Sequence, residues 1–144
     1  MKRRLLSIGL TIFILLIMFT PVYAASSSNW DFTMDYRVVD GDANGKYHNL
    51  KKGDMSLSGS IYAYSKDAGA VEKPYKVYIS IYESKTGVDR SVGKTSKTPS
   101  SQLNSPVKIS GSWGEQNAGK YYLIVYKSED DGWNIKGSGT IKTE

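Results

Sequence analysis

The segment Asp40–Gly45 carries the side chains of this sequence that are best spaced for metal binding. Its residues, DGDANG, place side-chain oxygens at the first, third and fifth positions and a glycine at the sixth, as in the first half of a calcium loop. Lys51 then stands at the twelfth position, where a bidentate glutamate belongs, so Asp40, Asp42 and Asn44 would need a carboxylate from elsewhere. Asp-Gly and Asn-Gly are also strong hairpin-turn signals. Two interpretations remain open: a calcium site, with Ca²⁺ the one candidate cofactor, or a plain turn.

The single histidine, His48, lies beside this segment. A zinc site or a serine-hydrolase triad would have to centre on it. No G-x-S-x-G motif occurs, and the absence of cysteine excludes a thiolate nucleophile and a disulfide framework. A carboxylate pair for glycoside hydrolysis is defined by its separation in space, which sequence does not encode. The sequence therefore predicts no enzyme and no catalytic residues, with a small secreted hydrolase as the remote alternative.

Tyrosine is abundant on the strand faces that the alternation predicts to point outward. The residues concerned are Tyr62, Tyr64, Tyr78, Tyr82, Tyr122 and Tyr126. Aligned on neighbouring strands, they would form an aromatic surface able to bind a sugar ring or a protein. Tyrosine also has high β-propensity and pairs well across strands without any ligand. Both the ligand surface and simple cross-strand packing remain open.

A basic segment, 85–108, contains Lys85, Arg90, Lys94, Lys97 and Lys108 against one acid, Asp89. On an exposed loop, such residues could contact an anionic cell wall or membrane surface. Arg90, Lys94 and Lys97 are therefore added to the tyrosines as candidate ligand contacts. A solvated loop explains the same composition. The segment has no interleaved aromatic residues, so nucleic acid is not predicted as a partner.

The first 24 residues have the organisation of a secretory signal peptide. Met1–Arg4 is basic, Leu5–Phe19 is an apolar run, and small residues precede a cleavage point after Ala24. The run is shorter than a membrane-spanning helix requires, so no membrane span is expected in the mature form. Removing Lys2, Arg3 and Arg4 lowers the formal net charge from +5 to about +2. We expect a secreted monomer with a flexible lead-in over residues 25–28.

Short alternating segments, and no helical periodicity, fill the chain after residue 28. They predict an all-β fold: a single antiparallel β-sandwich of seven or eight strands over residues 29–144. One half-buried strand is expected at Asn29–Val39, with Trp30, Phe32, Met34 and Tyr36 on its buried face and Asp31 on its solvent-exposed face. A long mobile loop is expected at Gly93–Pro106. The segment Gly119–Lys142 is expected to form a β-hairpin around the Asp131-Gly132 turn, with Gly137 and Gly139 on one face, where a neighbouring backbone approaches closely.

The run Leu50-Lys51-Lys52-Gly53-Asp54, the alternating strand after it, and Gly119-Lys120-Tyr121-Tyr122 resemble small secreted β-sandwich domains of bacilli and, more distantly, bacterial C-terminal pre-peptidase-type domains. The resemblance implies a binding or accessory module and assigns no functional residue. We therefore predict a secreted, non-catalytic binding module for an extracellular or cell-wall ligand. The alternative is a small antibacterial or toxin-like protein acting at an anionic cell surface.

Overall fold

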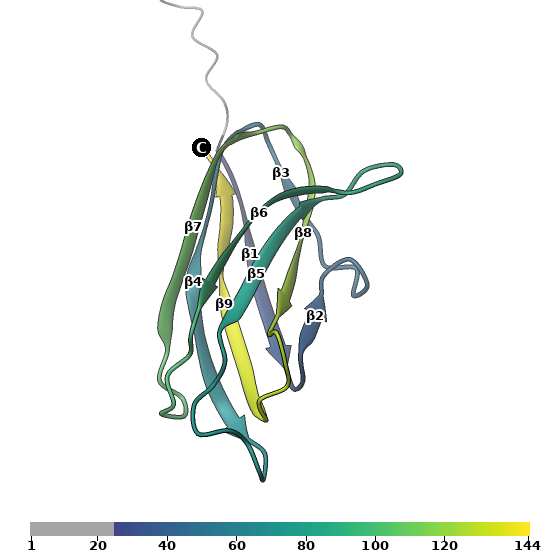
Figure 1. Ribbon diagram of the computed structural model, residues 1–144. Helices are drawn as coiled ribbons and strands as arrows, with labels where there is room; N and C mark the ends of the chain where they lie inside the picture. Colours follow the sequence, from purple (N-terminus) through teal and green to yellow (C-terminus); the bar gives the residue numbers. More distant parts are fainter. Residues whose placement is uncertain (1–24) are drawn as a thin grey trace, which may run out of the picture.

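The computed structural model describes residues 25–144, so the predicted signal peptide lies outside the described residues. These residues form the strands β1 (Ser26–Met34), β2 (Val38–Asp40), β3 (His48–Leu50), β4 (Gly53–Lys66), β5 (Val77–Glu83), β6 (Arg90–Lys97), β7 (Val107–Gln116), β8 (Gly119–Tyr126) and β9 (Trp133–Thr143). The first sheet has the order β1-β9-β4-β7. The second has the order β2-β8-β5-β6, with β3 also pairing with β8 (Figure 1). The predicted antiparallel β-sandwich is confirmed.

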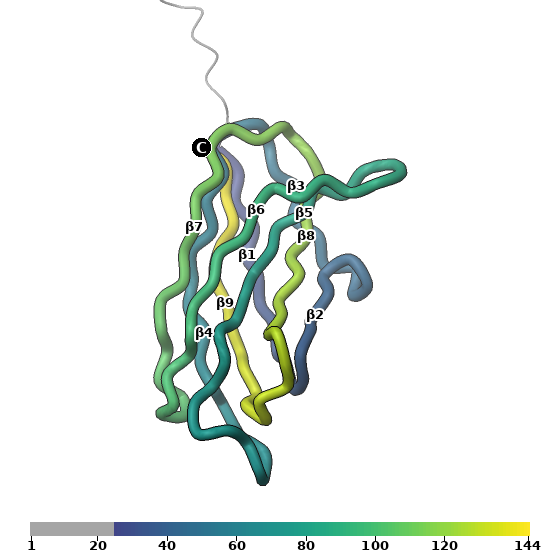
Figure 2. Tube along the Cα trace, viewed as in Figure 1, coloured from purple at the N-terminus to yellow at the C-terminus, as the bar shows by residue number. Residues whose placement is uncertain are grey.

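The strand order is that of a jelly roll. Each sheet is assembled from strands far apart in the sequence, because every connection except β2–β3 and β5–β6 crosses from one sheet to the other among the described strands. The tube in Figure 2 shows the yellow C-terminal strand running between the earlier strands β1 and β4. Within residues 25–144, the strands form both sheets and enclose a shared hydrophobic core.

The expected hairpin at Gly119–Lys142 is wrong. β8 pairs with β2, β3 and β5 in the second sheet, whereas β9 pairs with β1 and β4 in the first. The turn between them therefore carries the chain over the core from one sheet to the other. The alternation of each strand was predicted correctly. However, two strands that each bury one face can lie in opposite sheets just as well as they can pair in one hairpin.

Three further expectations are corrected at strand boundaries. Ser26–Ser28 are not a flexible lead-in, because they begin β1 and pair with Ile141–Thr143. The expected strand Asn29–Val39 is divided by a bend at residues 35–37, so β1 and β2 lie in different sheets, which raises the strand count of the described chain to nine. The expected loop Gly93–Pro106 begins only after Lys97, because β6 pairs with β5 as far as that residue.

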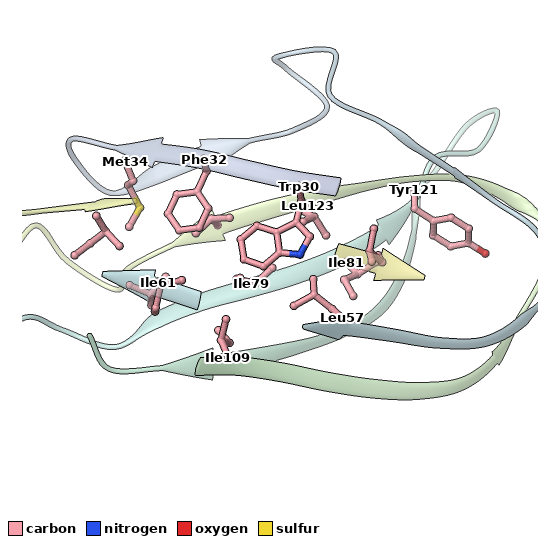
Figure 3. Close-up of a cluster of buried hydrophobic side chains, with 14 of the residues drawn as sticks. Trp30, Phe32, Met34, Leu57, Ile61, Ile79, Ile81, Ile109, Tyr121 and Leu123 are labelled. Atoms are coloured by element: carbon pink, nitrogen blue, oxygen red, sulfur yellow. The ribbon is translucent and has the colours of Figure 1, made fainter. Parts of the chain in front are cut away.

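The core lies between the two sheets and is built from the inward-facing positions of the alternating strands (Figure 3). Its buried members are Trp30, Phe32, Met34, Leu50, Met55, Leu57, Ile61, Ala63, Val77, Ile79, Ile81, Ile109, Tyr121, Leu123, Val125, Trp133, Ile135 and Ile141. Burial of this apolar surface is the main stabilising contribution to the fold, since the chain has no disulfides.

The predicted close approach of a neighbouring backbone is confirmed at Gly139, where an added Cβ would lie 2.6 Å from Cα of Gly59. At Gly137 the nearest atoms belong instead to the side chains of Phe32 and Ile61. A Cβ added to Gly139 would lie 2.7 Å from Cζ2 of Trp30, and one added to Gly137 would lie 2.8 Å from Cζ of Phe32. The two aromatic rings of β1 thus lie over β9 where it has no side chains. Among residues 25–144, no helix has the length and apolar character needed to cross a membrane.

Candidate functional site

A pocket of about 300 Å³ opens at one lateral edge of the sandwich, between β1 of the first sheet and the β2–β3 edge of the second. We call it the edge pocket. It is lined by Asn29, Trp30, Asp31, Phe32, Val39, Gly41, Gly45, Lys46, Tyr47, His48, Leu123 and Val125. Apolar core residues form its floor, and polar groups lie at its rim. This is the composition typical of small-molecule sites, and the volume is at the lower end of their range.

The pocket exists because the second sheet has an interrupted edge strand. β2 and β3 pair with different parts of β8, and the loop 41–47 leaves the sheet between them. Gly41 begins this excursion with its N–H donating to the carbonyl oxygen of Leu123 at 2.8 Å. A Cβ at Gly41 would lie 2.7 Å from that same oxygen, so the residue has to be glycine for the chain to turn there.

An ion pair spans the mouth of the pocket. Nζ of Lys46, in the loop, lies 3.0 Å from Oδ2 of Asp31, on β1, and thereby joins the two sheets across the opening. The side chains are 53% and 77% exposed. Exposed pairs of this kind contribute about 0–1 kcal/mol. A ligand can therefore replace the contact at little cost and use both the ammonium and the carboxylate as hydrogen-bonding groups.

Two buried side chains with ring nitrogens, Trp30 and His48, contribute to the pocket wall. The indole Nε1–H of Trp30 is buried and has no acceptor within the described part of the chain. Nδ1 of His48 is 2.8 Å from Oγ of Ser28. Burial lowers the pKa of His48, because the charged imidazolium is disfavoured away from water. No carboxylate orients the ring among the described hydrogen bonds, so the Ser28–His48 contact lacks the third group of a hydrolase triad.

The segment Asp40–Gly45 forms a tight turn. Oδ1 of Asp40 accepts hydrogen bonds from the backbone N–H groups of Asp42 at 2.9 Å and Ala43 at 3.3 Å, and the carboxylate of Asp42 accepts one from the Tyr47 hydroxyl. Gly45 adopts φ +65°, as the sixth position of the motif requires. No group of three or more acidic or histidine side chains within residues 25–144 is arranged to hold a metal ion. Calcium binding by Asp40, Asp42 and Asn44 stays a prediction of the sequence.

The structure brings four of the six candidate tyrosines together on the outer face of the second sheet. Tyr78 stacks on Tyr126 with ring centroids 5.1 Å apart, and Tyr82 stacks on Tyr122 at 5.5 Å. These are the cross-strand pairs of β5 and β8. Each ring therefore uses one face against its partner, and Tyr122 is only 6% exposed. Tyr62 and Tyr64 lie on β4 in the first sheet and are not part of this group.

The basic candidates are not gathered into one cationic surface. Nζ of Lys94 lies 5.7 Å from the ring centroid of Tyr78, on the tyrosine face. Nε of Arg90 instead contacts Oε2 of Glu83 at 2.7 Å, and its Nη2 donates to Gln116 at 2.8 Å. Lys97 is paired with the inward-facing Val77 and so lies on the opposite face of β6 from Lys94. Of the three, only Lys94 joins the candidate tyrosines.

The rim residues of the edge pocket were missed by reasoning from the sequence. The alternation predicts Asp31 on the solvent-exposed side of one long strand, and the sequence predicts Lys46 at the end of a turn-rich loop and Tyr47 at the start of a short strand. Their proximity depends on the bend at residues 35–37, which sends β1 and β2 to different sheets. The sequence carries no local signal for that change of sheet.

No protein-family model matches the sequence, and no curated protein matches it. Solved structures with a similar fold include TmCBM61 in complex with β-1,4-galactotriose (10% identity, 86% of this chain and 90% of that chain, TM-score 0.48). They also include a carbohydrate-binding module, CBM6cm-2, from Cellvibrio mixtus lichenase 5A in complex with cellotriose (13%, 85% and 99%, TM-score 0.46). A third is Aeromonas hydrophila PliG, a periplasmic inhibitor of g-type lysozyme (12%, 87% and 90%, TM-score 0.38). At these identities the likeness concerns the β-sandwich fold alone.

Proposed function

We propose that this protein is a secreted, non-catalytic binding module that holds one unit of a neutral saccharide in the edge pocket. The observation that carries the proposal is the pocket itself, in which an apolar aromatic floor meets a rim of hydrogen-bonding groups joined by a weak ion pair. A saccharide unit has matching chemistry, since its ring carbons present apolar C–H faces and its hydroxyls both donate and accept.

The size and charge of the pocket favour such a ligand. A dry cavity of about 150 Å³ holds benzene, so a pocket of about 300 Å³ accommodates a six-membered ring with polar substituents. The rim charges of Asp31 and Lys46 balance each other. The site therefore offers no net charge to select a strongly anionic or cationic ligand.

The absence of catalysis is part of the proposal and is supported by the state of His48. Its ring is 6% exposed, contacts Ser28, and has no carboxylate as a hydrogen-bond partner among the described contacts. A general base needs both an orienting group and access to a substrate proton. Secretion is proposed from the signal-peptide pattern of the first 24 residues.

Titration of residues 25–144 with a panel of neutral mono- and disaccharides tests this function. In ¹H–¹⁵N spectra, we expect the binding sugar to shift the amide signals of residues 29–32 and 41–48, which form the pocket wall. Lys46→Ala should weaken binding about three- to tenfold, the effect of losing one hydrogen bond of about 0.5–1.5 kcal/mol.

Lys142→Ala is the matched control. Lys142 also forms an exposed ion pair, with Glu144, but lies outside the edge pocket. Its replacement should leave saccharide affinity unchanged. If no sugar at millimolar concentration moves the pocket signals, or if the two lysine variants lose affinity equally, the proposed function is wrong.

A further inference from the structure

The edge pocket is continuous with a row of aromatic side chains that crosses the outer face of the second sheet. Tyr47 lines the pocket, and its ring packs at 86° against Tyr122 with centroids 6.2 Å apart. Tyr122 in turn stacks on Tyr82 with centroids 5.5 Å apart. We call these three residues the tyrosine row. The row leads from the pocket across β8 to β5. The distance between neighbouring ring centroids is about the length of one sugar unit.

The members of the row are held in place by charged neighbours. The Tyr47 hydroxyl donates to Asp42, in the loop 41–47, and the Tyr122 hydroxyl donates to Oδ2 of Asp89 at 2.8 Å, in the β5–β6 loop. Both loops extend to the right of the sandwich in Figure 1. Nζ of Lys120 lies 3.5 Å from the Tyr47 ring centroid. Side chains fixed in this way lose little conformational entropy when they contact a ligand.

The protonation state of these hydroxyls is also fixed. The hydrogen bond to Asp42 is the largest cause that raises the pKa of Tyr47, and desolvation, followed by Asp89, raises that of Tyr122. Both phenols therefore stay neutral at physiological pH. Each donates its proton to a carboxylate, and the half-buried Tyr47 keeps oxygen lone pairs able to accept a hydrogen bond from a ligand hydroxyl.

We propose that the natural ligand is a linear neutral oligosaccharide whose terminal unit occupies the edge pocket and whose next units lie along the tyrosine row. This rests on the proposed function. Because the row begins at a residue of the pocket wall, a chain leaving the mouth on that side meets Tyr47 first. Tyr122 is only 6% exposed and supports the row from below, so the chain contacts the half-buried Tyr47 and Tyr82. The faces of these two rings are partly used by neighbouring rings, which leaves ring edges and hydroxyl oxygens for the ligand. The carboxylates of Asp42 and Asp89 flank the row, and Lys120 offsets part of their charge, which fits a neutral chain.

The structure provides an internal control for the row. Tyr78 and Tyr82 both lie on β5, point outward and stack on a tyrosine of β8 in nearly the same geometry, at 15° and 14° between ring planes. Four residues along a strand separate them by about 13 Å. Only Tyr82 belongs to the row, because its partner Tyr122 contacts Tyr47.

The test uses residues 25–144 and a homologous series from mono- to tetrasaccharide of the sugar that binds best. Affinity should rise with chain length up to the trisaccharide, and Tyr82→Ala should reduce trisaccharide affinity about threefold to tenfold. The same variant should leave monosaccharide affinity unchanged. Tyr78→Ala should leave both affinities unchanged. Tyr82→Phe keeps the ring that stacks on Tyr122. It therefore shows whether a loss of affinity in Tyr82→Ala results from displacement of the Tyr122 ring.

The outcomes separate the two proposals. Monosaccharide binding in the pocket with no gain from longer chains, or equal losses in the Tyr82 and Tyr78 variants, overturns the tyrosine row and leaves the pocket intact. Oligosaccharide binding that is insensitive to Lys46→Ala overturns the pocket as the anchoring site and the row that starts from it. Failure of every chain length to bind overturns both.

Discussion

The side chains of Lys127 and Asp131 form an ion pair in which neither is exposed to solvent. Nζ of Lys127 also donates to the carbonyl of Trp133 at 2.8 Å, and the Asp131 carboxylate accepts from the backbone N–H groups of Tyr75 at 2.6 Å and Trp133 at 2.9 Å. Asp131→Ala leaves a buried ammonium and two unpaired N–H groups, so it should lower the free energy of unfolding by about 3–5 kcal/mol. Urea unfolding measures this change.

The companion variant Lys127→Met should be less damaging. It leaves the carboxylate of Asp131 with both of its backbone donors, and the long apolar side chain fills the space of the lysine. If Lys127→Met destabilises the protein as much as Asp131→Ala, the backbone hydrogen bonds of the carboxylate do not have the role assigned to them here.

Single-residue burial could be predicted well wherever a strand is regular. Alternation correctly placed Trp30, Phe32 and Met34 in the core, but it placed Tyr36 there too, and that side chain is 62% exposed because the chain bends at residues 35–37. Lys127 is a larger exception. Its charge marks it as a surface residue, and only the nearby carboxylate and carbonyl, which tertiary structure supplies, allow it to be buried.

For the segment that contains Asp40, Asp42 and the loop 41–47, the sequence allows two interpretations, a calcium site or a plain turn. Oδ1 of Asp40 and Oδ1 of Asp42 accept hydrogen bonds from this segment, and within residues 25–144 no third acidic side chain lies close enough to complete a metal site with them. We expect the thermal midpoint of residues 25–144 to be the same in chelator and in millimolar calcium. Binding at 100 times the dissociation constant would add about 2.7 kcal/mol, or roughly 10 °C. A rise that Asp42→Ala abolishes would contradict this prediction and establish the calcium site.

Strand content could be predicted from alternation, but strand partnership could not. The alternation in β8 and β9 was predicted correctly. However, an alternation of period two indicates only that one face of a strand is buried, and it does not indicate to which sheet the strand belongs. The edge pocket could not be predicted for the same reason, because its rim is formed by β1 and by a loop of the opposite sheet. Once the structure shows that β5 and β8 are neighbours, the tyrosines spaced four residues apart on each strand pair as Tyr78 with Tyr126 and Tyr82 with Tyr122.

At the scale of the whole molecule, the jelly roll links every part of the core to distant parts of the chain. β9, the last strand, lies between β1 and β4, so the first sheet is completed only when the C-terminal segment is in place. A local change in one sheet therefore affects the stability of the entire sandwich. This makes global unfolding a sensitive measure of a single buried group, including the wall of the edge pocket.

His48 should give the protein a pH-dependent stability in a range where few other groups titrate. Burial lowers its folded-state pKa below the usual value of about 6.5, so the unfolded chain binds a proton that the folded chain does not. The stabilising effect is present above pH 6.5 and is lost as the pH falls from there toward the folded-state pKa, by at most about 1.4 kcal/mol per pH unit. Glu83 and Asp89, whose pKa values are lowered, lose their contribution to stability only below about pH 4.5.

Urea unfolding between pH 5 and pH 7.5 should show this dependence of stability on pH in the wild type and not in His48→Asn, because the chain has no other histidine. A slope that persists unchanged in the variant would assign the effect to another group and leave His48 protonated as readily in the folded wall of the pocket as in the unfolded chain.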